Sequence, residues 1–167
     1  MNTKEFSSAH EKEVAAHLNW KVVSGSGARH TYPGDLISDD WLGECKTHVA
    51  YNPKILFQFS VWEKISEEAH SKFRFPVLFV DAGRQSCKTT WCMFQNIPCL
   101  KPDIIDAPSY VKVNKNSISI DVEKMNHRLH SEVFSSLHPT IYRVDVPDKG
   151  SYFITSLDHF GRMLLGD

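Results

Sequence analysis

Cysteine is scarce in this chain: there are four in 167 residues, and no two have the CxxC spacing of a zinc or redox motif. The sequence also lacks a signal peptide and any apolar run near the ~18 residues that cross a bilayer. We therefore expect a cytoplasmic protein with free thiols and no membrane segment. A zinc site built from Cys87, Cys92 and either His127 or His130 is a less favoured alternative, because its spacing is loose.

The chain has no excess of positive charge. Nineteen Lys and Arg residues stand against 20 Asp and Glu residues, which gives a net charge of −1. A broad basic surface for nucleic acid is therefore not indicated, and any such contact requires local positive charge. Internal repeats and low-complexity linkers are also missing, and the absence of a Gly-x-Ser-x-Gly motif makes a serine hydrolase a weaker interpretation. We expect one domain over residues 1–167, with a core at about 4–95 and a C-terminal elaboration at about 96–167.

The most informative stretch covers residues 34–47, with the sequence GDLISDDWLGECKT. Asp35 opens a short apolar run, a polar turn follows, and a second strand-like run carries Glu44 and Lys46. Strand side chains alternate between faces, so Glu44 and Lys46 point the same way while Cys45 points into the opposite, buried face. If the two runs form a hairpin, Asp35 comes beside that pair.

Two neighbouring carboxylates repel each other unless a cation lies between them, and hard oxygen ligands suit Mg²⁺. A lysine beside them can orient or deprotonate a water, or neutralise charge on a phosphorus centre. This combination indicates metal-assisted phosphodiester hydrolysis. The alternative is an exposed strand on which Glu44 and Lys46 are merely solvated.

The pattern of Asp35 followed by Glu44-Cys45-Lys46 resembles the PD-(D/E)XK nuclease superfamily, with Gly34-Asp35 in place of Pro-Asp. The stretch from Glu11 to Lys46 is most similar to the archaeal-type Holliday-junction resolvases and their phage-encoded relatives. Those proteins share a helix bearing an acid, a strand that ends in a Ser-Gly segment, and the two strand motifs. The interval between Asp35 and Glu44 is short for the family, which requires a tight hairpin.

The resemblance implies an α/β fold with a restriction-endonuclease-like core, in which a central mixed β-sheet is flanked by helices. It implies an Mg²⁺-dependent endodeoxyribonuclease, with Mn²⁺ as an alternative ion, that acts as a homodimer on branched or junction DNA in recombination and repair. The cell would be bacterial, archaeal or phage-infected. Asp35, Glu44 and the Cys45 backbone carbonyl would bind the metal, and Lys46 would activate water.

A helix is expected over residues 4–18, with Ser8 and Glu11 resembling a capping box. In the resolvases a helical glutamate joins the strand acids, directly or through water. Matching the motif assigns this role to Glu11, although the helical wheel also allows Glu13.

Contacts to the DNA backbone are expected before the first acid of the motif. The loop at residues 24–33 is rich in glycine and hydroxyl groups, which suit phosphate binding, although a flexible connection is the simpler interpretation. Ser24 stands where the family often has a basic residue, so Lys21 or Arg29 would supply that charge, with Ser24 and Ser26 beside it.

A second helix is expected at about residues 54–71, and Lys54 and Gln58 would share one of its faces near the metal site. Residues 76–81 and 89–94 read as buried strands. Residues 96–116 suggest a surface excursion. A small strand at 117–120, one or two helices at 122–137, a hairpin of 141–146 with 152–155, and a last helix capped by Ser156 complete the predicted order.

Several alternatives share this sequence pattern. A nickase or a restriction-like DNA-processing nuclease would use the same catalytic residues on another substrate. A non-catalytic DNA-binding or protein-binding module would keep the fold without cleavage. A metal-free structural protein would tolerate changes at Asp35 and Lys46.

Overall fold

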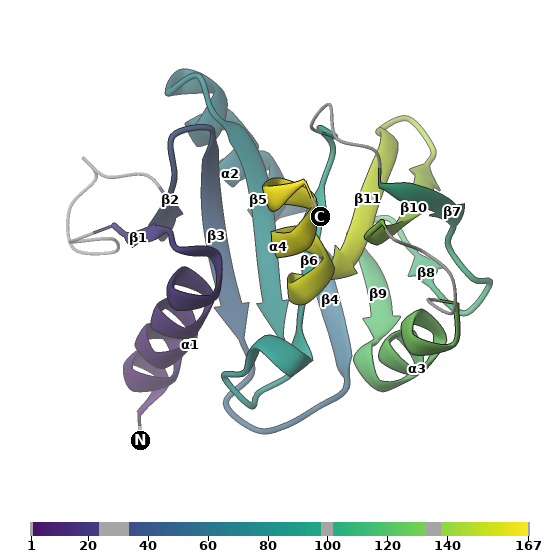
Figure 1. The fold of residues 1–167 in the computed structure, drawn as a ribbon, viewed down its shortest axis with the longest axis horizontal. Coiled ribbons are helices and arrows are strands. Elements are labelled where there is room, and N and C mark those ends of the chain that lie inside the picture. Colours follow the sequence, from purple (N-terminus) through teal and green to yellow (C-terminus); the bar gives the residue numbers. More distant parts are fainter. Residues whose placement is uncertain (1, 24–33, 98–101, 133–137, 167) are drawn as a thin grey trace.

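The structure is a computed structural model that describes residues 2–23, 34–97, 102–132 and 138–166. These residues form a mixed α/β fold with an eight-stranded sheet, a three-stranded sheet and four α-helices (Figure 1). The predicted α/β class with a central mixed sheet is confirmed at this level. Among the helices of the described residues, none combines the length and apolar character needed to span a bilayer.

The first half of the chain places a helix before a strand, a hairpin, a crossover helix and two further strands, as the sequence predicts. One additional short strand, β4, precedes the crossover helix. The elements are α1 (Thr3–Leu18), β1 (Lys21–Val22), β2 (Leu36–Ile37), β3 (Trp41–Thr47), β4 (Lys54–Gln58), α2 (Phe59–Ser71), β5 (Phe75–Asp81), the 3₁₀ turn η1 (Cys87–Thr89) and β6 (Thr90–Phe94).

The second half adds strands to both sheets and two helices. Its elements are β7 (Asp103–Asp106), β8 (Lys112–Val113), β9 (Ser117–Asp121), α3 (Val122–Glu132), β10 (Thr140–Val146), β11 (Gly150–Ser156) and α4 (Leu157–Leu165). The predicted strand at 117–120, hairpin and last helix are confirmed, and Ser156 caps α4 by accepting from the His159 N–H at 3.2 Å.

The main sheet has the order β1-β2-β3-β5-β6-β11-β10-β7. The β1, β2 and β3 strands are antiparallel, β3 runs parallel to β5, and β7 runs parallel to β10. Residues 96–116 are therefore more than a surface excursion, because β7 forms one edge of the main sheet. The C-terminal hairpin also extends this sheet, since β11 pairs with β6.

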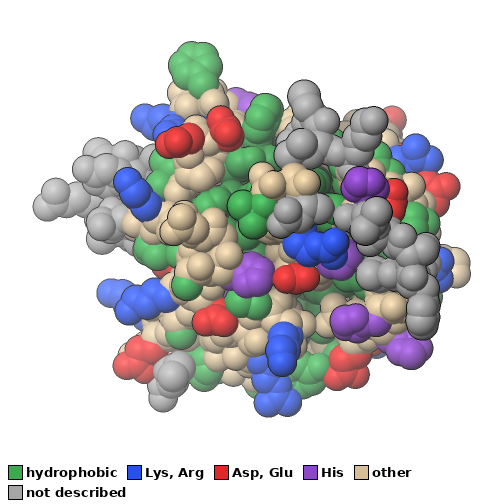
Figure 2. Space-filling model, viewed as in Figure 1, with side chains coloured by type: hydrophobic (Ala, Val, Ile, Leu, Met, Phe, Trp, Pro, Cys, Tyr) green, Lys and Arg blue, Asp and Glu red, His purple; other side chains and the backbone are tan. Residues whose placement is uncertain are grey.

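Two apolar clusters cover the two faces of the main sheet. One lies beneath α1 and α4 and includes Val14, Phe79 and Phe160. The other lies between the sheet, α2, α3 and the small β4-β9-β8 sheet. Figure 1 shows α1 and α4 in front of the main sheet and α2 behind it. Acidic and basic side chains are interspersed over the front face, and histidines gather around α3 (Figure 2).

The first helix begins earlier than its predicted cap. Asn2 is the N-cap: its side chain accepts from the Glu5 N–H at 3.0 Å, and the Glu5 carboxylate accepts from the Asn2 N–H at 2.7 Å. This reciprocal pair is a capping box, so the prediction that Ser8 and Glu11 form one was wrong. The helix itself, predicted over residues 4–18, is confirmed as α1.

The prediction of a helix from residue 54 was wrong for its first five residues, which form β4. In β4, Ile55 and Phe57 are buried and their neighbours are exposed, as expected for a strand with one core face. The strand pairs antiparallel with β9. Ile55 and Phe59 are four residues apart, a spacing that suits both a helical stripe and one face of a strand, so periodicity alone did not separate the two.

Candidate active site

Hydrogen bonds on both sides hold Asp35 in the β2-β3 hairpin. Its backbone N–H donates to the Gly43 carbonyl at 2.8 Å, and its carbonyl accepts from the Val23 N–H at 2.8 Å. Its side-chain Oδ2 also accepts from the Cys45 N–H at 2.9 Å. The expected tight hairpin therefore forms, and it brings Asp35 beside the strand of the second motif.

Glu44 and Lys46 lie on the same face of β3. The Lys46 Nζ atom lies 3.2 Å from the Glu44 Oε1 atom, and the Glu44 side chain is 17 % exposed against 52 % for Lys46. Cys45 between them is buried in the cluster beneath α1 and α4, and burial raises the pKa of its thiol well above the usual range. The alternation expected from the sequence is present, and the Cys45 thiol is kept in its unreactive form.

Glu11 reaches the same region from α1. Burial, followed by the negative charges of Asp35 and Glu44, raises the pKa of the Glu11 carboxyl to about 7, against an opposing effect of Lys46. Burial and then Asp35 likewise raise the pKa of Glu44, while the Lys46 ammonium lowers it. Glu11, Asp35, Glu44 and Lys46 are therefore close enough for their charges to interact.

The pairing of β2 with β3 is short. Among the described strands, β2 pairs with β3 only at Leu42 and Gly43, so the later part of β3 meets no strand on that side. The Glu11 carboxyl interacts with the charges of Asp35 and Glu44 although α1 packs over the face of β3 that carries Cys45. Glu13 is exposed and instead accepts from the Cys87 thiol at 3.3 Å. The structure thus brings Glu11, and not Glu13, to the strand acids.

The donor set fits a hard divalent cation in its chemistry. Three carboxylates within electrostatic range of one another offer the oxygen ligands that Mg²⁺ prefers, and a cation would relieve the repulsion that raises the pKa values of Glu11 and Glu44. Over the described residues, no three Asp, Glu, His or Cys side chains already form a cluster ready to hold a metal. In the structure the Lys46 ammonium is the cation next to Glu44.

The structure describes three of the six residues that were predicted to contact DNA. Lys21 is exposed on β1. Ser24, Ser26 and Arg29 lie outside the described residues. Lys54 and Gln58 do not share a helical face, because they stand at the two ends of strand β4, where both are exposed on the side away from the core.

The cysteines and histidines of the zinc alternative are spread over separate elements. Cys92 is buried in β6, Cys87 lies in η1, and His127 and His130 are exposed on α3. Within the residues that the structure describes, they form no metal-binding group.

Sequence reasoning missed two residues of α2 that act on this region. The Glu68 carboxylate accepts from the Gly34 N–H at 3.1 Å, and the Lys64 charge lowers the pKa of Glu44. Lys64 and Glu68 are also an i,i+4 pair, 4.0 Å apart. That spacing was visible in the sequence, but nothing local indicated which strands the pair would face.

A buried carboxylate anchors the far end of β3. Asp81 accepts from the hydroxyls of Thr47 at 2.7 Å and Thr89 at 2.6 Å, and from the N–H groups of Gly83 at 2.9 Å and Gln85 at 2.8 Å. Burial alone would raise its pKa, but these hydrogen bonds outweigh burial and lower it. Asp81 thus remains charged as a structural anchor beside the strand that carries Glu44 and Lys46.

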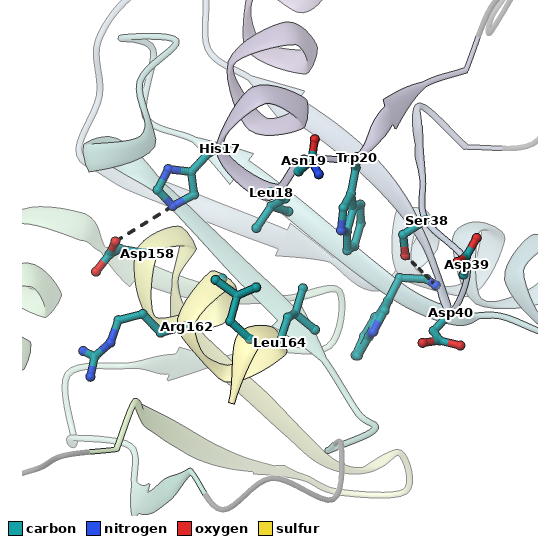
Figure 3. A pocket seen from close by; sticks show the side chains of 13 residues that line it. His17, Leu18, Asn19, Trp20, Ser38, Asp39, Asp40, Asp158, Arg162 and Leu164 are labelled. Atoms are coloured by element: carbon teal, nitrogen blue, oxygen red, sulfur yellow. Dashed lines mark hydrogen bonds and ion pairs between the residues drawn. The ribbon is translucent and has the colours of Figure 1, made fainter. Parts of the chain in front are cut away.

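A separate hollow of about 540 Å³ lies between the end of α1, α4 and the β2-β3 turn. In Figure 3, Leu18 and Trp20 point from the end of α1 toward α4, and His17 pairs with Asp158 at 3.9 Å. Asp39 and Asp40 stand at its opposite side. The four charged residues described above do not line this hollow, so it is distinct from the candidate active site.

No known family model, curated protein or solved structure matches the chain.

Proposed function

We propose that this chain is a metal-dependent endodeoxyribonuclease that hydrolyses phosphodiester bonds. The observation that supports this function best is that the carboxyl groups of Glu11, Asp35 and Glu44 interact electrostatically with one another beside the Lys46 ammonium. Such a set of mutually repelling acids is unfavourable for folding alone. Perturbed pKa values of this kind are typical of functional sites.

Each residue has a separate role in the proposed reaction. Asp35 and Glu44, with the Cys45 carbonyl, would hold Mg²⁺, or Mn²⁺ in its place, and Glu11 would complete the acidic cluster directly or through water. When bound, the ion would offset the charge that develops at the phosphorus centre and lower the pKa of a water molecule. Lys46, half-exposed at the end of this group, would orient or deprotonate the attacking water and stabilise the transition state.

The order of elements is consistent with a restriction-endonuclease-like core. Helix α1 precedes the β1-β2-β3 meander, and α2 then leads to β5, which is parallel to β3. In the resemblance to PD-(D/E)XK nucleases, the two motif strands are the β2-β3 hairpin and the acid-bearing helix is α1. This agreement supports the proposal through topology, in addition to the residue types.

Branched DNA is the proposed substrate and a homodimer the proposed assembly. Both follow from the similarity to the junction resolvases, because a two-fold symmetric dimer matches paired cuts on a four-way junction. The proposed setting is recombination or repair in the cytoplasm of a bacterial, archaeal or phage-infected cell.

Purified protein mixed with four-way junction, flap and plain duplex DNA, in Mg²⁺ or in EDTA, tests this function. We expect Mg²⁺-dependent cutting of the junction. Cutting of flap or duplex instead would retain the chemistry and replace the substrate with that of a nickase or restriction-like nuclease. Binding without cutting in Mg²⁺ and in Mn²⁺ would favour a non-catalytic DNA-binding module.

A further inference from the structure

The backbone before Asp35 is tied to helix α2 by one long-range hydrogen bond. The Gly34 N–H donates to the Glu68 Oε2 atom at 3.1 Å, across 34 residues of sequence. The Glu68 side chain is only 27 % exposed, so the bond is partly shielded from water. Its donor is the backbone N–H of Gly34, the residue directly before Asp35, which carries the first acid of the site.

The backbone at residue 34 accepts only glycine. Gly34 has φ +72°, in the left-handed region that glycine enters most easily. A Cβ atom there would lie 2.8 Å from the Leu42 Cγ atom, so a bulkier residue cannot stiffen the backbone. Proline, which precedes the acid in the nucleases that this chain resembles, is incompatible with a positive φ. The hydrogen bond to Glu68 adds a constraint on the N-terminal side of Asp35, beside the bonds that Asp35 itself makes.

The same helix also acts on the second half of the motif. Lys64 lies one turn before Glu68, with its Nζ atom 4.0 Å from Glu68 Oε1, and its charge lowers the pKa of Glu44. Lys64 therefore offsets the negative charge that Glu68 adds near the acids. Through this pair, α2 interacts with the backbone before Asp35 and with the charge of Glu44.

We propose that Glu68 is a positioning residue for Asp35, which it holds in place through the Gly34 N–H. This inference rests on the proposed function, because positioning matters only if Asp35 binds the metal. Side chains that orient metal ligands typically contribute about 10- to 100-fold to affinity or activity. Glu68 would act through its hydrogen bond to the Gly34 N–H.

Three variants separate the hydrogen bond from the charge. Glu68→Ala removes the acceptor and the charge, whereas Glu68→Gln removes the charge and keeps an amide oxygen that can accept. Glu67→Ala, at the exposed neighbour on the same helix, is the matched control. Mn²⁺ affinity, measured by water-proton relaxation, provides a readout that does not depend on cleavage. Hydrogen exchange of the Gly34 amide reports on the bond directly.

We expect Glu68→Ala to speed exchange of the Gly34 amide, to weaken Mn²⁺ binding about 10- to 100-fold, and to lower kcat more than it raises KM for DNA. Glu68→Gln should recover most of each effect, and Glu67→Ala should match the wild type. Unchanged Mn²⁺ affinity in Glu68→Ala, or an equal loss in Glu68→Gln, would overturn the inference. If the wild type binds Mn²⁺ but cuts no DNA, the proposed function fails while these affinities still decide the role of Glu68. If the wild type binds no Mn²⁺, both proposals fall.

Discussion

The Oδ2 atom of Asp35 accepts a hydrogen bond from the Cys45 N–H at 2.9 Å. This bond joins the side chain just before β2 to the peptide group between Glu44 and Cys45. A carboxylate bound by a backbone N–H keeps its second oxygen for another partner, since each oxygen carries its own lone pairs. The geometry of Asp35 is thus fixed relative to the other charged groups before any ligand arrives.

Replacement of Glu11 and of Glu13 shows which of them is the helical acid of the active site, a choice that the sequence left open. Glu11→Gln should lower metal-dependent DNA cleavage about 10- to 100-fold, because it removes a carboxylate from the cluster. Glu13→Gln should cleave at the wild-type rate, since Glu13 contacts Cys87 instead. Steady-state rates of both variants on the best DNA substrate give the answer. Normal cleavage by Glu11→Gln with an inactive Glu13→Gln would show that the assignment is reversed.

Glu11 also makes stability depend on pH in the absence of metal. Its pKa in the fold is about 7, above its ordinary value of 4.5, so the folded state favours the protonated form. The unfolded chain releases this proton first as pH rises, and folding loses stability between pH 4.5 and pH 7. Because Glu11 is half-buried, solvent screening limits the effect to about 1 kcal/mol.

Glu11→Gln should therefore gain stability over the wild type at pH 8 but not at pH 4.5. Urea unfolding at both pH values, in EDTA, measures this difference, and Glu13→Gln serves as the control. An equal stability change at the two pH values would contradict the raised pKa of the Glu11 carboxyl. Residues that destabilise a fold while serving a site are a recurrent pattern in functional proteins.

His10 should also make the stability of the fold depend on pH, but here stability should fall as the pH is lowered. Its side chain is fully buried and donates or accepts one hydrogen bond, at 3.1 Å from the Thr90 hydroxyl, while its Nδ1 atom has no partner. Burial lowers the pKa of His10 from 6.5 to about 4, although Asp81 and Glu13 oppose this. As pH falls from 6.5 to 4, the unfolded chain takes up a proton that the folded protein does not.

Stability should therefore fall by about 3 kcal/mol over that range through His10. The variant His10→Gln should lose this component of the pH dependence, whereas His127→Gln, at an exposed position on α3, should keep it. Denaturant unfolding at pH 7 and pH 4.5 measures both. If His10→Gln loses as much stability between pH 7 and pH 4.5 as the wild type does, other groups are responsible.

Much of the hairpin and little of its surroundings could be predicted from the sequence. Local alternation was enough to place Glu44 and Lys46 on one face of β3 and Cys45 on the other. The choice between Glu11 and Glu13 depended on which side of α1 meets the sheet, and burial of His10, Val14 and Ala15 decides that only in the fold. The sequence carried no signal for a contact between Gly34 and Glu68, because the two are brought together by tertiary packing alone.

Gly43 is expected to tolerate no side chain. A Cβ atom there would lie 2.6 Å from the Phe79 Cε2 atom, in the cluster beneath α1. Gly43→Ala should therefore destabilise the protein by about 1 to 3 kcal/mol, as overpacking of a core does. Gly161→Ala is the control, since its Cβ atom meets only side-chain atoms at 3.3 Å or more and alanine favours the helix. Equal midpoints of thermal unfolding for the two variants would contradict the close packing.

The measurement that tests the central claim most directly is DNA cleavage in Mg²⁺ by the wild type, Asp35→Asn and Asp39→Asn. Asp35→Asn keeps an oxygen that can accept from the Cys45 N–H, so the hairpin should remain folded while one ligand charge is lost. Asp39→Asn changes an exposed acid of the same hairpin. We predict Mg²⁺-dependent cutting by the wild type and Asp39→Asn, and a loss of at least about 100-fold in Asp35→Asn. Cleavage by Asp35→Asn at the wild-type rate would contradict the proposed active site.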